Sequence, residues 1–166
     1  MLIQKDEKYI PSIDAMKFIG FIRGSENESN DSPEVHYKIA DALFSPAKRD
    51  RKVVIECTRG LGKSTTVEYA VIYAAAVGEW PGFGKVPFIV FLGASQEGNV
   101  KQFFKNVANK IERSKLISSV LSVKRVTDNE LELVNVNGVE TMIVGRGMST
   151  NFRGLRSKSG DRPTLV

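Results

Sequence analysis

Apolar positions between residues 53 and 113 follow two periods in turn, and the pattern predicts alternating strands and helices. Two continuous apolar runs, residues 53–55 and 88–92, are typical of buried strands. Residues 63–77 are apolar on nearly all sides, as expected of a buried helix, and Ser95 is placed to cap a further helix that extends to about Ile111. This order predicts an α/β fold in which helices flank a parallel sheet.

The pattern is different at both ends of the chain. Residues 13–22 predict a helix, as part of the core or as an interaction arm, and residues 25–33 are polar and resemble a linker. A further helix is expected after Pro33. Residues 130–144 alternate around Asn137-Gly138, which predicts an inserted β-hairpin. We therefore expect an N-terminal arm and linker at residues 1–32 and one domain at residues 33–166.

Composition limits the class of protein. With 166 residues, 42% of them apolar, the chain can bury the core of about one domain. The net charge of +5 favours an anionic partner, although a solvated basic surface explains it equally well. One cysteine and one histidine exclude an internal disulfide and an ordinary zinc site. The absence of a long apolar run or a signal peptide predicts a soluble, intracellular protein without a membrane partner.

The main candidate site follows the first apolar run. A strand, a glycine-bearing turn and Gly-Lys-Ser at the start of a helix form the P-loop arrangement, in which backbone N–H groups converge on phosphate oxygens. The residues of this stretch are Cys57-Thr58-Arg59-Gly60-Leu61-Gly62-Lys63-Ser64-Thr65.

Each of these residues has an expected place around a nucleotide. Lys63 reaches the β- and γ-phosphates, the Ser64 hydroxyl binds Mg²⁺, and Thr65 lies near the α-phosphate. The usual P-loop pattern has glycine where Cys57 stands, so we expect Gly60 to supply the flexibility. The alternative is an ordinary turn with one solvated lysine. We favour the phosphate site because the tripeptide lies between a strand and an apolar helix.

Three other features allow two interpretations each. His36 is either a packed or surface residue or a contact to an adenine base upstream of the P-loop. The basic residues 48–52 form either a soluble entry to a strand or a phosphate contact. The loop at residues 145–156 is rich in glycine and arginine, and is either a flexible linker or a source of arginines, Arg153 and Arg156, that act on phosphate charge.

Taken in order, these motifs resemble the N-terminal ATPase domain of the large terminase subunit of tailed bacteriophages. The resemblance spans residues 33–166 and rests on the variant P-loop, the strand that ends at Gly93-Ala94-Ser95, the long helix, the hairpin, and the stretches at residues 152–156 and 162–166. It implies a P-loop NTPase fold of the RecA-like (ASCE) type. It also implies that Arg59 senses the γ-phosphate, that His36 stands near the adenine-contacting position, and that Arg153 or Arg156 acts on a neighbouring subunit.

The resemblance further implies the activity and the partners. The activity is ATP hydrolysis with Mg²⁺, coupled to translocation of double-stranded DNA into a procapsid in the host cytoplasm. The partners are a portal protein, a small terminase subunit and further copies in a ring, a pentamer by family resemblance. The paired carboxylates of the second phosphate motif would follow Val166, so this chain alone is expected to bind nucleotide weakly and hydrolyse it poorly.

Two other functions fit the same motifs. A nucleic-acid helicase of related fold also places a base-contacting residue upstream of its P-loop, and strand-separation assays would identify it. A non-hydrolysing assembly module would use nucleotide only to order the domain for docking. For that module, Lys63→Ala would affect assembly rather than hydrolysis.

Overall fold

The computed structural model describes residues 11–25, 32–44, 53–56, 58–80, 84–148 and 154–164, and the structural statements below concern these residues. Their helices are α1 (Pro11–Ser25), α2 (Glu34–Phe44), α3 (Lys63–Val77), the π-helical turn η1 (Gln96–Val100), α4 (Lys101–Arg113) and α5 (Lys115–Val120). Their strands are β1 (Glu79–Trp80), β2 (Gly84–Lys85), β3 (Phe88–Gly93), β4 (Leu121–Val126), β5 (Glu130–Asn135) and β6 (Glu140–Gly147).

The main sheet has four strands in the order β3-β6-β5-β4. The pair β3–β6 is parallel, whereas β6–β5 and β5–β4 are antiparallel. The α/β class is therefore confirmed, but the expected parallel sheet is a mixed sheet in the described part of the chain. The predicted hairpin is present as β5 and β6, yet it is not an insertion, because β6 pairs with β3 at the centre of the sheet.

The prediction of a strand at residues 53–55 is wrong. Residues 53–56 have no strand assignment, and the Val54 side chain is 82% exposed. A strand needs a neighbour with which its N–H and C=O groups pair, and no described strand pairs with this segment. The apolar run alone therefore did not reveal that the pairing partner was missing. Near the other end, Thr164 donates its N–H to the Phe88 carbonyl over 2.8 Å, but residues 163–164 form no strand.

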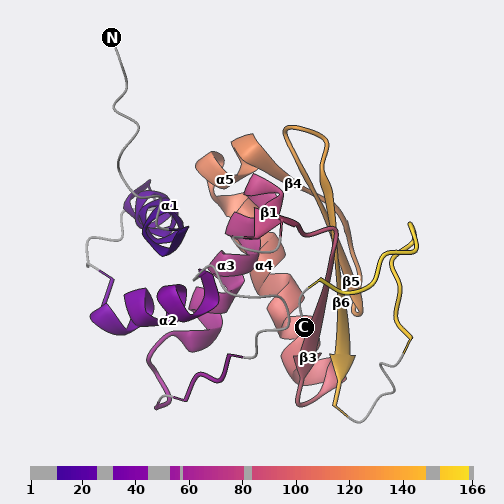
Figure 1. Ribbon diagram of the computed structural model, residues 1–166, viewed down its shortest axis with the longest axis horizontal. Helices are drawn as coiled ribbons and strands as arrows, with labels where there is room; N and C mark the ends of the chain where they lie inside the picture. Colours follow the sequence, from indigo (N-terminus) through magenta and orange to yellow (C-terminus); the bar gives the residue numbers. More distant parts are fainter. Residues whose placement is uncertain are drawn as a thin grey trace.

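The elements form layers on one side of the sheet (Figure 1). Helices α3, α4 and α5 cover one face, and α1 and α2 lie beyond α3, farther from the sheet. The opposite face is crossed by residues 154–164, where Leu155 packs against Phe88, Val90 and Val144. No helix among the described residues is long and apolar enough to cross a bilayer.

Local sequence explains the central helices. Nine residues of α3 are buried, in agreement with its predicted all-round apolar character. The Ser95 hydroxyl accepts hydrogen bonds from the Gly98 and Asn99 N–H groups, so the predicted cap is confirmed, although the first turn is π-helical. Helix α1 joins the same core as α3, because Met16, Ile19 and Ile22 are buried there and Phe18 packs on Tyr73 with ring centroids 5.4 Å apart.

Candidate functional site

The candidate site is built around the start of α3. Helix α3 begins at Lys63, directly after Gly62, whose φ of 67° and ψ of 19° place it in the left-handed region. The first bond of the helix runs from the Thr66 N–H to the Gly62 carbonyl over 2.8 Å. The N–H groups of Ser64 and Thr65 precede it and have no partner within the helix, as at every helix N-terminus. This end of α3 therefore offers hydrogen-bond donors and a positive helix dipole to an anion.

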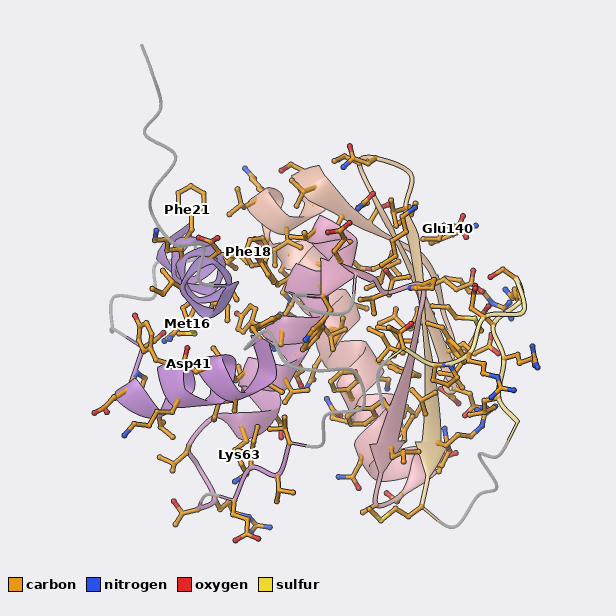
Figure 2. All side chains as sticks on the ribbon, in the orientation of Figure 1. Met16, Phe18, Phe21, Asp41, Lys63 and Glu140 are labelled. Atoms are coloured by element: carbon orange, nitrogen blue, oxygen red, sulfur yellow. The ribbon has the colours of Figure 1, made fainter. Side chains whose placement is uncertain are left out.

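The Lys63 side chain folds back over the loop that precedes its own helix. Its Nζ donates to the Thr58 carbonyl over 3.0 Å. Gly60, at the turn between these residues, has a φ of 93°, and Arg59 beside it is exposed. Figure 2 shows Lys63 at the end of α3 nearest this loop. The Lys63 ammonium thus bridges the two ends of residues 58–63, and Arg59 within this loop is open to solvent.

His36 reaches the same loop from α2. Its Nε2 lies 3.0 Å from the Leu61 carbonyl oxygen. A carbonyl can only accept, so this hydrogen bond requires a proton on Nε2. A Cβ placed on Gly62 would lie 2.8 Å from the same nitrogen, so only glycine allows the imidazole this close to the backbone. The structure therefore brings His36 to the P-loop candidate, across 25 residues of sequence.

A small pocket lies beside His36 and is also lined by Gly62 and Thr65. Its volume is about 150 Å³, below the range of about 300–1,000 Å³ typical of whole small-molecule sites, so it suits one ring system of a ligand. Met16 and Ile19 of α1 and Tyr69 of α3 supply apolar surface, and Arg23 of α1 supplies charge. These four wall residues were not predicted. The period of residues 13–22 predicted a helix, but no local signal indicated that it packs beside the P-loop.

A second cavity lies beside Lys63. It has a volume of about 220 Å³ and is lined by Lys63 and Ser64 together with apolar side chains from α2, α3, α4, β3 and Ile55. Two of those side chains, Phe91 and Phe103, are stacked with ring centroids 3.9 Å apart. Lys63 and Ser64, the first two residues of α3, therefore border a mainly apolar cavity.

The described residues of the predicted P-loop form one site with His36, whereas Arg156 lies elsewhere in the fold. Thr58, Arg59, Gly60, Leu61, Gly62, Lys63, Ser64 and Thr65 form one continuous loop and first helical turn, with His36 beside it. Cys57, Arg153 and the basic residues 48–52 lie outside the described residues. Arg156 is exposed, and its Nη1 donates to the Gly160 carbonyl over 3.2 Å. Because its segment crosses the sheet face opposite α3, Arg156 does not join the P-loop of its own chain (Figure 1).

A metal ion at this site would depend on a bound ligand. Among the described residues, no three His, Cys, Asp or Glu side chains lie close enough together to hold one. The Ser64 hydroxyl is exposed at the start of α3 and is the predicted ligand for Mg²⁺. Since Mg²⁺ in nucleotide sites takes few protein ligands besides phosphate oxygens and water, one hydroxyl is a fitting donor set.

The comparisons with known proteins gave no relative. Neither a protein-family model, nor a curated protein, nor a solved structure matches this chain.

Proposed function

We propose that residues 58–65 bind the phosphates of ATP and that His36 lies at the base side of the same nucleotide. One observation carries this proposal. The loop holds Lys63 Nζ over the Thr58 carbonyl and a helix N-terminus at Gly62, and His36 approaches that same turn. Backbone donors, a lysine and a helix dipole converge where an anionic phosphate chain would lie.

Each residue has a specific part in this site. The Lys63 ammonium would exchange the Thr58 carbonyl for phosphate oxygens, which it prefers because they carry charge. Ser64 would hold Mg²⁺, and Thr65 would donate near the α-phosphate. Arg59 is exposed, and on the family resemblance it would sense the γ-phosphate. Bound Mg²⁺·ATP would supply the phosphoryl group and the charge neutralisation that the transfer requires.

The pocket beside His36 fits the base of that nucleotide. Met16 and Ile19 would cover the faces of a planar ring, while Arg23 and the imidazole offer polar edges. Position also supports this placement, because the pocket shares Gly62 and Thr65 with the phosphate loop. Helix α1 is then part of the nucleotide site, and not only an arm attached to it.

The resemblance in the sequence extends the proposal to a process. We infer that this ATP site belongs to a DNA-packaging ATPase of the terminase large-subunit type, which moves double-stranded DNA into a procapsid. Its partners would be a portal protein, a small terminase subunit and neighbouring copies in a ring. Arg156 is exposed on a face away from the P-loop of its own chain, a position from which it could serve a neighbour. Arg153 is proposed for the same role on the resemblance alone.

The first experiment is a titration of the chain with a non-hydrolysable ATP analogue and Mg²⁺. Calorimetry measures the binding, and thermal unfolding measures the shift in Tm. Ligand at about 100 times its Kd adds about 2.7 kcal/mol of stability, a shift in Tm of about 5–10 °C for a chain of this size. Lys63→Ala should abolish the shift. Lys85→Ala, which removes an exposed lysine of β2, is the matched control and should leave it intact.

The outcomes distinguish the candidates. Binding lost in Lys63→Ala, with hydrolysis that is weak in this chain alone but rises when double-stranded DNA is added, supports the packaging ATPase. Strand separation in place of duplex translocation would identify a helicase. Nucleotide binding that changes assembly without any hydrolysis would identify an assembly module. An unchanged titration in Lys63→Ala would overturn the nucleotide site itself.

A further inference from the structure

A separate cavity lies between α1, α3, α4 and α5. It has a volume of about 1060 Å³ and is partly open to solvent, and we call it the α4–α5 groove. The groove shares Tyr69 with the small pocket beside His36 but contains no residue of the loop at 58–65. Its size is that of a site for an extended ligand, and exceeds what a single small anion would fill.

The charge of the groove is positive. The described residues that line it include Lys110, Arg113 and Lys115 but no Asp or Glu. Lys110 already pairs with Glu68 over 2.7 Å, and the Glu68 side chain is only 4% exposed behind it. The net charge offered to a ligand therefore comes from Arg113 and Lys115, which are both exposed. A groove with cations and no carboxylate attracts an anionic ligand.

An aromatic side chain stands at the rim of the groove. Phe21 lines it and is 67% exposed, whereas Phe18 of the same helix packs inward on Tyr73. Figure 2 shows the Phe21 ring projecting from α1 on a different side from Met16. Lys17 is also exposed and lies one helical turn before Phe21, so both side chains share one face of α1. The groove thus carries an exposed aromatic ring, and Lys17 places a cation on the same face of α1.

Asn109 adds hydrogen-bonding capacity between these groups. It lines the groove, is exposed, and lies one turn before Arg113 on α4. An amide both donates and accepts, as the edges of nucleobases do. Proteins that bind single-stranded nucleic acids combine cations that contact phosphates with aromatic rings that stack on bases. The α4–α5 groove has cations, an amide and an exposed aromatic ring.

We propose that the α4–α5 groove binds a single strand of nucleic acid, with Arg113 and Lys115 on its phosphates and Phe21 stacked on a base. A duplex does not explain Phe21, because paired bases hide their faces in the stack. This binding is distinct from the proposed ATP site, and it does not depend on nucleotide. It also differs from the duplex translocation proposed above.

The test is fluorescence anisotropy with a labelled oligothymidine of about 20 nucleotides and with a duplex of equal length. Phe21→Ala should weaken oligothymidine binding between about 5-fold and 150-fold, the range that loss of one base stack produces. Phe21→Trp should retain binding. Because Phe21 is mainly exposed, neither change should impair folding, which thermal unfolding checks.

The cations are tested by salt dependence. Arg113→Ala combined with Lys115→Ala should reduce the slope of log K against log salt by about 1.4, which is two phosphate contacts on a single strand. Lys85→Ala is the control for loss of one charge elsewhere, and Lys63→Ala should leave oligothymidine binding unchanged. Preference for the duplex, or equal binding by Phe21→Ala and Lys85→Ala, would overturn the proposal without affecting the ATP site.

Discussion

Gly62 combines a left-handed backbone conformation with close contact to His36 in the candidate site. Its left-handed φ of 67° costs an alanine about 1 kcal/mol, and an added Cβ would lie 2.8 Å from His36 Nε2. Gly62→Ala should push the imidazole away and break its bond to Leu61, worth about 1 kcal/mol more. We therefore expect a loss of about 2 kcal/mol in the free energy of unfolding, measured by urea denaturation.

Two controls separate the contributions at Gly62. Gly60→Ala also places alanine at a positive φ, of 93°, but nothing lies within 4 Å of its Cβ, so it lacks the clash. His36→Ala removes the imidazole that the new Cβ would meet. In that background, Gly62→Ala should lower the free energy of unfolding by less than it does in the wild type. Additive losses in this cycle would show that His36 and Gly62 do not interact in solution.

At the scale of elements, the sequence predicted local structure better than pairing. The apolar periods of residues 63–77 and 88–92 and the Asn137-Gly138 turn all correspond to observed elements, because local packing and turn chemistry determine them. The predicted strand at residues 53–55 was wrong, because an apolar run forms a strand only where a neighbouring strand pairs with it. The candidate P-loop is a local sequence motif, whereas the pocket beside it, with walls from α1, depends on tertiary packing that the sequence did not reveal.

A buried ion pair joins α3 to α4. Glu68, with 4% of its side chain exposed, accepts from Lys110 Nζ over 2.7 Å and from Asn106 Nδ2 over 2.8 Å. Lys110→Met leaves a buried carboxylate without its cation and should cost about 3 kcal/mol in urea denaturation. Adding Glu68→Gln removes that charge while keeping the acceptor for Asn106, and should restore most of the loss. A double variant as unstable as Lys110→Met would contradict this explanation.

A second ion pair ties residues 154–164 to the sheet and makes their docking depend on pH. The hydrogen bond from Lys158 holds the pKa of Glu132 on β5 below its ordinary value of 4.5. Its stabilisation is therefore complete above about pH 4.5 and is lost as pH falls through the lower pKa of the folded state. Glu132→Gln should be less stable than the wild type at neutral pH. The two should converge in strongly acidic buffer, as urea denaturation at both pH values would show.

For the whole molecule, the central question is whether α1 folds as part of the core. The sequence left two possibilities for residues 13–22, core or interaction arm, because an amphipathic period does not identify the surface that it covers. In the structure, α1 packs on α2 and α3. Ile22 is fully buried in the same cluster as Ile72 of α3 and Leu131 of β5. Unfolding of α1 should then accompany unfolding of the sheet.

Trp80, the single tryptophan, reports on this coupling from outside α1. It is buried, donates its Nε1–H to the Leu43 carbonyl over 3.1 Å, and stacks on Phe44 with ring centroids 4.7 Å apart. Ile22→Ala removes fully buried methyl groups and should lower the free energy of unfolding by about 2–5 kcal/mol. The loss should appear equally in Trp80 fluorescence and in circular dichroism, because one cooperative unit has one transition.

Ile13→Ala is the matched control on the same helix. Ile13 is 43% exposed, so the change should stay within about 0.5 kcal/mol of the wild type. If Ile22→Ala instead melts only part of the circular dichroism signal and leaves the Trp80 transition unmoved, α1 unfolds independently. The pocket beside His36 would then lose its α1 wall without loss of the fold. Nucleotide affinity would fall at temperatures where the sheet is still intact, so this measurement also determines whether the proposed base pocket is as stable as the core.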